Sequence, residues 1–140
     1  MTTNAAWIAA IQAMTVTGVT HHYNEPPPSI NTADMPCAFP LLPSGERGEL
    51  ITSCIGNNKP RNIKYVIIVG PVAQDTNANN YATLGGHMDN LETALDALTK
   101  PQGGSVGQRI DYTITARGDF PVSEVNHWAI EADVTLRDAF

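Results

Sequence analysis

The feature that most constrains the fold is a run near the end of the sequence in which apolar and polar residues alternate. From Trp128 to Leu136 the alternation is almost unbroken. It places apolar side chains on one face of a strand and polar ones on the other, which is typical of a half-buried antiparallel strand. A preceding segment has the same period, with apolar residues at Ile110, Tyr112, Ile114 and Ala116. The two segments predict a pair of strands in one sheet.

Two other segments have the spacing of amphipathic helices. The first follows the possible N-caps Thr3 and Asn4 and is expected to end at Gly18. Its apolar residues recur at intervals of three and four: Trp7, Ile8, Ile11 and Met14. In the second, the apolar stripe consists of Leu84, Met88, Leu91, Leu95 and Leu98. Because Gly85 and Gly86 disfavour a helix, we expect the ordered part of this second helix to begin near His87.

The segments between the helices predict further strands. Val19 to Tyr23 and Leu50 to Ile55 favour short strands, and the proline-punctuated run Met35 to Pro43 favours an edge strand. Ile63 to Val69 is apolar on both faces, which is typical of a central strand covered by a helix. A polar turn, Gly56 to Pro60, is expected before it.

These elements predict one α+β domain over residues 1–140, with an extended proline-rich arm near 24–43. The expected architecture is a mixed, mainly antiparallel sheet with two amphipathic helices packed on one face. A chain of 140 residues, of which 42% are hydrophobic, suits a single core.

Charge and composition narrow the classes of partner. The formal net charge is -6 and no basic stripe is present, so sequence-specific nucleic-acid binding is not expected. The apolar stretch from Ala5 to Val16 is too short to span a bilayer, which predicts a soluble, intracellular protein without membrane association. Cys37 and Cys54 each lie in an apolar stretch and are predicted to be buried free thiols.

No set of residues predicts a catalytic, cofactor or metal site. His21 and His22 would point to opposite faces of a strand, and His87 and His127 have no ligand spacing, so packed or solvated histidines are expected. The loop Gly103 to Gly107 lacks the lysine and following helix of a phosphate loop.

Two short charged motifs also have simple structural explanations. Arg117-Gly118-Asp119 is predicted to be a turn. Glu131 and Asp133 should share one face of the last strand, where a solvated or interface surface is favoured over acid–base chemistry.

Three segments are longer than a compact monomer requires: 25–29, 75–80 and 103–107. Such arms and loops around a small sheet are what a subunit uses to grip its neighbours in a ring. The order of the other elements resembles that of the tail terminator, or tail completion, proteins of long-tailed bacteriophages. The resemblance is carried by the N-terminal helix with Trp7, the strand Met-Pro-Cys-Ala-Phe-Pro at 35–40, the long strand at 63–69, the helix at 84–99 and the final pair of alternating strands.

The resemblance implies a structural virion protein in the tail or neck, assembled in the host cytoplasm. Such a protein forms a homo-oligomeric ring, commonly a hexamer, that caps the tail tube protein and offers a surface to the head–tail connector protein. It implies neither enzymatic activity nor a cofactor. Candidate subunit or tube contacts, placed by loop geometry, are Asn77, Asn79, Asn80, Gly103, Gly104, Ser105 and Gly107.

Two alternatives stay open at this point. Another head–tail connector or a tail tube subunit would use the same kind of fold. A small α+β enzyme or ligand-binding domain would instead use a pocket between sheet and helices, with His21, His22 or His127 at its rim.

Overall fold

A computed structural model describes residues 4–30, 32–41, 58–71, 80–98, 109–122 and 125–139. Their elements are α1 (Asn4–Gln12), β1 (His21–His22), a 3₁₀ turn η1 (Thr32–Asp34), β2 (Cys37–Leu41), β3 (Asn58–Pro71), α2 (Asn80–Asp96), β4 (Arg109–Val122) and β5 (Val125–Ala139). The predicted α+β class, with a mixed and mainly antiparallel sheet and two helices, is confirmed.

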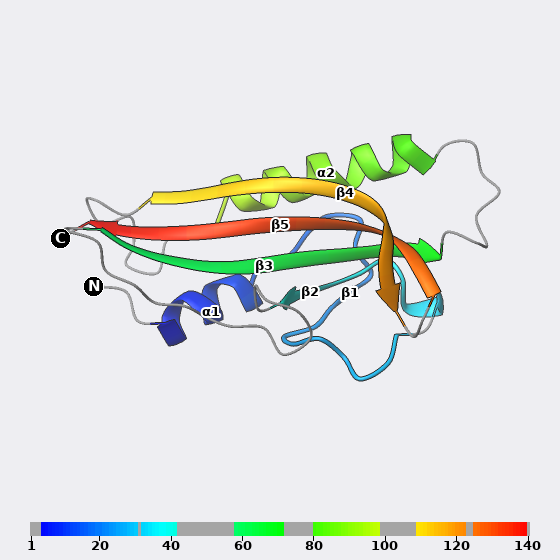
Figure 1. Ribbon diagram of the computed structural model, residues 1–140, viewed down its shortest axis with the longest axis horizontal. Coiled ribbons are helices and arrows are strands. Elements are labelled where there is room, and N and C mark those ends of the chain that lie inside the picture. Colours follow the sequence, from blue (N-terminus) through cyan, green and yellow to red (C-terminus); the bar gives the residue numbers. More distant parts are fainter. Residues whose placement is uncertain are drawn as a thin grey trace.

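The five strands form one sheet in the order β1-β2-β3-β5-β4. Among the pairs that the described strands form, only the short β1–β2 pair is parallel. The three long strands β3, β5 and β4 lie side by side along most of the molecule (Figure 1). Strand β5 therefore lies between β3 and β4, and β4 is the last of the described strands in the sheet.

One face of the sheet carries the main core. Both helices pack on this face, because Trp7 and Ile11 of α1 and Leu91 of α2 are fully buried in one apolar cluster with inward residues of the strands. The strand residues of this cluster include Ile63, Tyr65, Ile67, Ile130, Ala132, Val134 and Leu136. The side-chain amide of Asn90 on α2 donates to the carbonyl of Thr17, at 3.0 Å, and so ties α2 to the segment that follows α1.

The opposite face carries a smaller apolar cluster. It consists of Cys37, Phe39, Val66 and Ile68, with Tyr23, Ile30, Met35, Leu41 and Phe120 packed against it. Several of these packing residues come from the proline-rich segment before β2, so the predicted arm covers this end of the sheet. Cys37 is a buried free thiol as predicted, whereas Cys54 lies outside the described residues.

The long strands extend beyond their predicted limits. Pro60 was expected in a turn but lies within β3, opposite Arg137. Pairing with β2 stops at Lys64, so among the described residues β3 has only β5 beside it at Pro60. A proline is tolerated where one side of a strand makes no ladder bonds.

The predicted turn at Arg117-Gly118-Asp119 is wrong. Strand β4 continues to Val122, and its register with β5 shifts between Arg117 and Phe120. A Cβ at Gly118 would lie 2.7 Å from the Trp128 ring, so this ring packs directly over the glycine. The irregularity therefore bends a continuing strand, and β4 curves away from the long axis beyond it (Figure 1).

Helix boundaries also differ from the prediction. Helix α2 begins at Asn80 and not near His87. Burial of Leu84 in the core offsets the low helix propensity of Gly85 and Gly86, which face open space. Helix α1 ends at Gln12, and Gly18 instead adopts a positive φ of 87° in a later turn.

Other predictions concern the rim of the sheet. The short strand near 19–23 is confirmed as β1, and the run 35–43 contains β2. Strand β2 is not the outermost strand, because β1 pairs with Cys37 and Ala38. The predicted strand at 50–55 lies outside the described residues.

Candidate functional site

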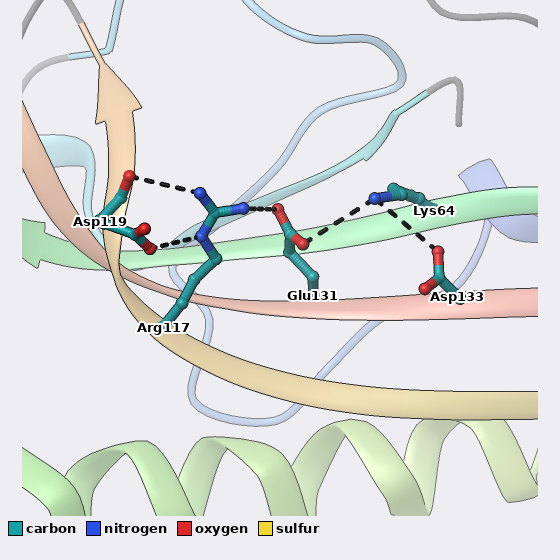
Figure 2. Close-up of polar contacts among 5 residues, drawn as sticks. All are labelled: Lys64, Arg117, Asp119, Glu131 and Asp133. Atoms are coloured by element: carbon teal, nitrogen blue, oxygen red, sulfur yellow. Dashed lines mark hydrogen bonds and ion pairs between the residues drawn. The ribbon is translucent and has the colours of Figure 1, made fainter. Parts of the chain in front are cut away.

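A row of charged side chains crosses the sheet on the face opposite the helices. It comprises Lys64 on β3, Glu131 and Asp133 on β5, and Arg117 and Asp119 on β4 (Figure 2). We call this set the charged row. No described helix packs on this part of the sheet.

Strand alternation and register position these side chains. On β5, Glu131 and Asp133 alternate with the buried residues Ile130, Ala132 and Val134, and so point away from the helices. Lys64 is directly opposite Asp133 in the β3–β5 pair. The predicted common face of the two carboxylates is confirmed.

Glu131 lies at the centre of the row. Arg117 donates from Nη1 to Glu131 Oε1 at 3.3 Å, and Lys64 Nζ lies 4.0 Å from Glu131 Oε2. Only 15% of the Glu131 side chain is exposed, against 54% for Asp133, so the central carboxylate is the more shielded of the two. A partly buried carboxylate between two cations is electrostatically compensated.

Arg117 is held from several sides. Its Nε donates to Asp119 Oδ1 at 2.7 Å, and its Nη2 donates to the Asp119 carbonyl at 3.4 Å. The guanidinium carbon lies 5.7 Å from the centre of the Phe120 ring, which is a cation–π distance. The bulge after Arg117 brings Asp119 and Phe120 within reach of the guanidinium.

These contacts favour the charged forms of Arg117 and Asp119. The hydrogen bond from Arg117, followed by its positive charge, lowers the pKa of Asp119 below its ordinary value. The same hydrogen bond, with the charges of Glu131 and Asp119, raises the pKa of Arg117. Asp119 is thus a poor proton donor near neutral pH, and the row is suited to electrostatic recognition.

Three of the four histidines have ring nitrogens within hydrogen-bond distance of the backbone, at separate places. The Val16 N–H donates to His22 Nε2 at 3.0 Å, and His21 Nδ1 and His127 Nδ1 are within hydrogen-bond distance of the Asp34 and Val125 carbonyls. Burial lowers the pKa of His87. In the described parts of the chain, no three His, Cys, Asp or Glu residues are grouped so that they could hold a metal ion.

The buried thiol on this face is not activated. Burial, and then the charge of Asp34, raises the pKa of Cys37 to about 11. The thiolate that a nucleophile requires is therefore scarce near neutral pH.

The loop contacts predicted from the sequence fall mostly outside the described residues. This holds for Asn77, Asn79, Gly103, Gly104, Ser105 and Gly107. Asn80 is described and is the first residue of α2, not part of a loop. None of the described helices is long and apolar enough to cross a membrane.

Lys64 and Arg117 were not recognised from the sequence as members of one site. Each is a single charge within a separate strand, and only the register of β3, β5 and β4 brings them to Glu131. The alternating carboxylates at 131 and 133 were the one available signal. Comparison of the chain with models of protein families and with curated proteins found no match.

Proposed function

We propose that this chain is a structural virion protein, a ring-forming tail terminator that caps the tail tube and joins the tail to the head connector. The class of protein comes from the resemblance in the order of elements. The observation that carries an assembly role is the charged row, a broad surface of fixed, alternating charges on a sheet face that no described helix covers.

The division of the sheet into two faces supports this proposal. The helix face has a large buried cluster and accounts for the stability of the subunit. The other face retains charges that add little to stability when exposed but select partners of complementary charge. A subunit of a ring needs such a surface for its neighbours or for the tube.

The overall charge is consistent with the same role. A net charge of -6 disfavours retention of DNA by the wall of a ring through which DNA passes. The proposed partners are further copies of the chain, the tail tube protein and the head–tail connector protein.

The proposal is tested by measuring the molar mass of the purified chain by light scattering at several concentrations, alone and with tail tube protein, and then imaging the samples in negative stain. Closed rings, or a single cap at one end of each tube, are expected. Long tubes of the chain itself would identify a tube subunit. A monomer that also fails to bind tube ends would overturn the proposal in favour of an enzyme or ligand-binding domain.

A deletion tests the predicted loop contacts separately. Removal of Gly103 to Gly107 should abolish ring or cap formation, whereas the Tyr81→Ser change on the exposed start of α2 serves as a control and should not. Normal assembly after the deletion would remove this loop from the account.

A further inference from the structure

The turn that follows α1 is held by side chains from two other elements. The Val19 N–H donates to the Val16 carbonyl at 3.3 Å, and Gly18 has a positive φ of 87°, which together define a tight turn over residues 16–19. The turn is anchored in the main core, because Val16 is 3% exposed within that cluster. Side chains of β1 and of α2 contact its backbone, and each contact includes a histidine.

His22 of β1 accepts a hydrogen bond from the turn. The Val16 N–H donates to His22 Nε2 at 3.0 Å. A ring nitrogen accepts only while it carries no proton, so this bond requires a neutral His22. When His22 is protonated, both ring nitrogens are donors and the Val16 N–H would face another N–H. Protonation therefore breaks this contact.

His87 of α2 packs against the same turn. A Cβ at Gly18 would lie 3.7 Å from His87 Cε1 and 3.8 Å from His87 Nδ1, so the edge of the ring adjoins the glycine. Nδ1 is buried and has no hydrogen-bond partner among the described residues. Burial accordingly lowers the pKa of His87 below its ordinary value of 6.5. A proton on this ring is favoured only when the turn moves away and water reaches the nitrogen.

The titratable side chains beside His22 contact other groups. His21 lies within hydrogen-bond distance of the Asp34 carbonyl and 4.0 Å from the Asp34 carboxylate. Tyr23 stacks on the His21 ring. Strand β2 places an alanine opposite His22, and residues 13–19 contain no titratable side chain. The described surroundings of His22 therefore favour the neutral ring that the turn requires.

The described elements around His87 direct no charge at its ring. Helix α1 contains no titratable residue, and the β5 residues in the core beneath α2 are apolar. Asp89 and Glu92 are exposed, and spacings of two and five residues place them on other faces of α2. Tyr112 of β4 donates to Asp96, nine residues beyond His87. A proton on His87 is therefore not compensated by these groups.

From these contacts we infer that the turn 16–19 is a pH-sensitive latch, which ties the end of α1 to β1 and α2. The latch is closed while His22 and His87 are neutral, and it opens when they are protonated. The Asn90 amide also donates to the Thr17 carbonyl at 3.0 Å, but this bond does not titrate. Opening removes an apolar side chain from the main cluster and loosens the connection to α1, while the strands stay paired.

The pH range of opening follows from His87. Because its pKa is lowered in the closed state, the open state binds the proton more readily, so closure is complete above pH 6.5 and weakens below it. At pH 5, one histidine of ordinary pKa in the open state favours opening by up to about 30-fold. The inference does not depend on the proposed function, because the latch opens within a single copy.

Amide exchange followed by NMR tests the latch, with protection factors that correct for the intrinsic effect of pH. From pH 7.5 to pH 5, protection of the Val16 and Val19 amides should fall at least about tenfold, while that of β5 amides is retained. In the double variant His22→Gln and His87→Leu, the fall should be less than about twofold. Glutamine can accept from the Val16 N–H at either pH, and leucine does not titrate.

Two control variants separate titration from simple loosening of the turn. His21→Gln replaces the neighbouring histidine, which contacts Asp34 instead of the turn, and should leave the tenfold fall unchanged. Asn90→Ala removes a bond that does not titrate, and should lower protection of the turn by a similar factor at both pH values. Circular dichroism at pH 7.5 verifies that each variant is folded.

A titration of the unchanged chain provides a test that needs no variant. The NMR signals of the His22 or His87 ring should shift with the same midpoint as the loss of turn protection. The inference is overturned if protection of Val16 and Val19 is unchanged at pH 5, or if the opening midpoint matches neither histidine. It is also overturned if the folded double variant loses as much protection as the unchanged chain.

Discussion

The two faces of β5 differ sharply in composition and burial. Toward the helices, Ile130, Ala132, Val134 and Leu136 are all fully buried. On the other face, Glu131 is held between Arg117 and Lys64. One strand therefore has two different sides: its apolar side holds the subunit together, and its charged side is the one that the proposed function assigns to partners. Substitutions on the first side should affect folding, and those on the second should affect association.

The largest effect is expected from Trp7→Ala. Trp7 is fully buried between α1 and the sheet, so its removal leaves a large cavity and should lower the free energy of unfolding by about 3–5 kcal/mol. Urea denaturation measures the loss. The control is Tyr81→Ala, because the Tyr81 side chain is 80% exposed. If Tyr81→Ala lowered the free energy of unfolding as much as Trp7→Ala, the assignment of the core would be contradicted.

The next effect concerns pH and the smaller apolar cluster on the face opposite the helices. Burial raises the pKa of Cys37 in this cluster from 9.0 to about 11, so this thiol ionises at lower pH in the unfolded chain than in the folded one. The contribution of Cys37 is complete below pH 9 and is lost as the pH rises toward 11, by about 2 kcal/mol. Between pH 8 and 11, the melting temperature should decline less for Cys37→Ala than for the unchanged chain. Equal declines in the two proteins would mean that this thiol is not buried.

A pair of glycine substitutions compares the bend in the sheet with an open helix surface. Gly118→Ala should lower stability by about 1–3 kcal/mol, because the new methyl group would overlap the Trp128 ring. Gly86→Ala should raise it by about 0.5–1 kcal/mol, because its surroundings are open and alanine favours a helix. Equal effects in chemical denaturation would contradict the close packing at Gly118.

The smallest effect on folding is expected from the charged row. Glu131→Gln should lower the free energy of unfolding by about 1 kcal/mol, because Arg117 and Lys64 lose their shared carboxylate. The matched change Asp133→Asn, on a carboxylate 54% exposed, should alter it by less than about 0.5 kcal/mol. The difference in unfolding free energy between the two variants should diminish in 1 M salt. A loss of several kcal/mol for Glu131→Gln would instead mean that the charged row is part of the folding core.

The spacing of apolar residues along the sequence was sufficient to predict the fold class, the two helices on one face and the last strand. Its errors lie where tertiary contacts override local preference. Gly118 suggested a turn, but the Trp128 ring that covers it belongs to another strand. Gly85 and Gly86 suggested a late helix start, but Leu84 is anchored in the core.

The charged row was predictable only in part for the same reason. Alternation gave the common face of Glu131 and Asp133, but the partners of Glu131 depend on the register of three strands. No local pattern around Lys64 contains that register. A surface made of single charges from separate strands is therefore recognisable only once the strands are aligned.

The central claim is that the helix face forms the subunit, while the opposite face, with its charged row, forms contacts with other chains. Hydrogen–deuterium exchange of dilute and concentrated samples tests it most directly. The account predicts that association slows exchange of amides in β3, β4 and β5, which carry the charged row, and leaves the amides of α1 and α2 unchanged. Slowed exchange confined to the helices, or no change in these three strands when the chain associates, would contradict it.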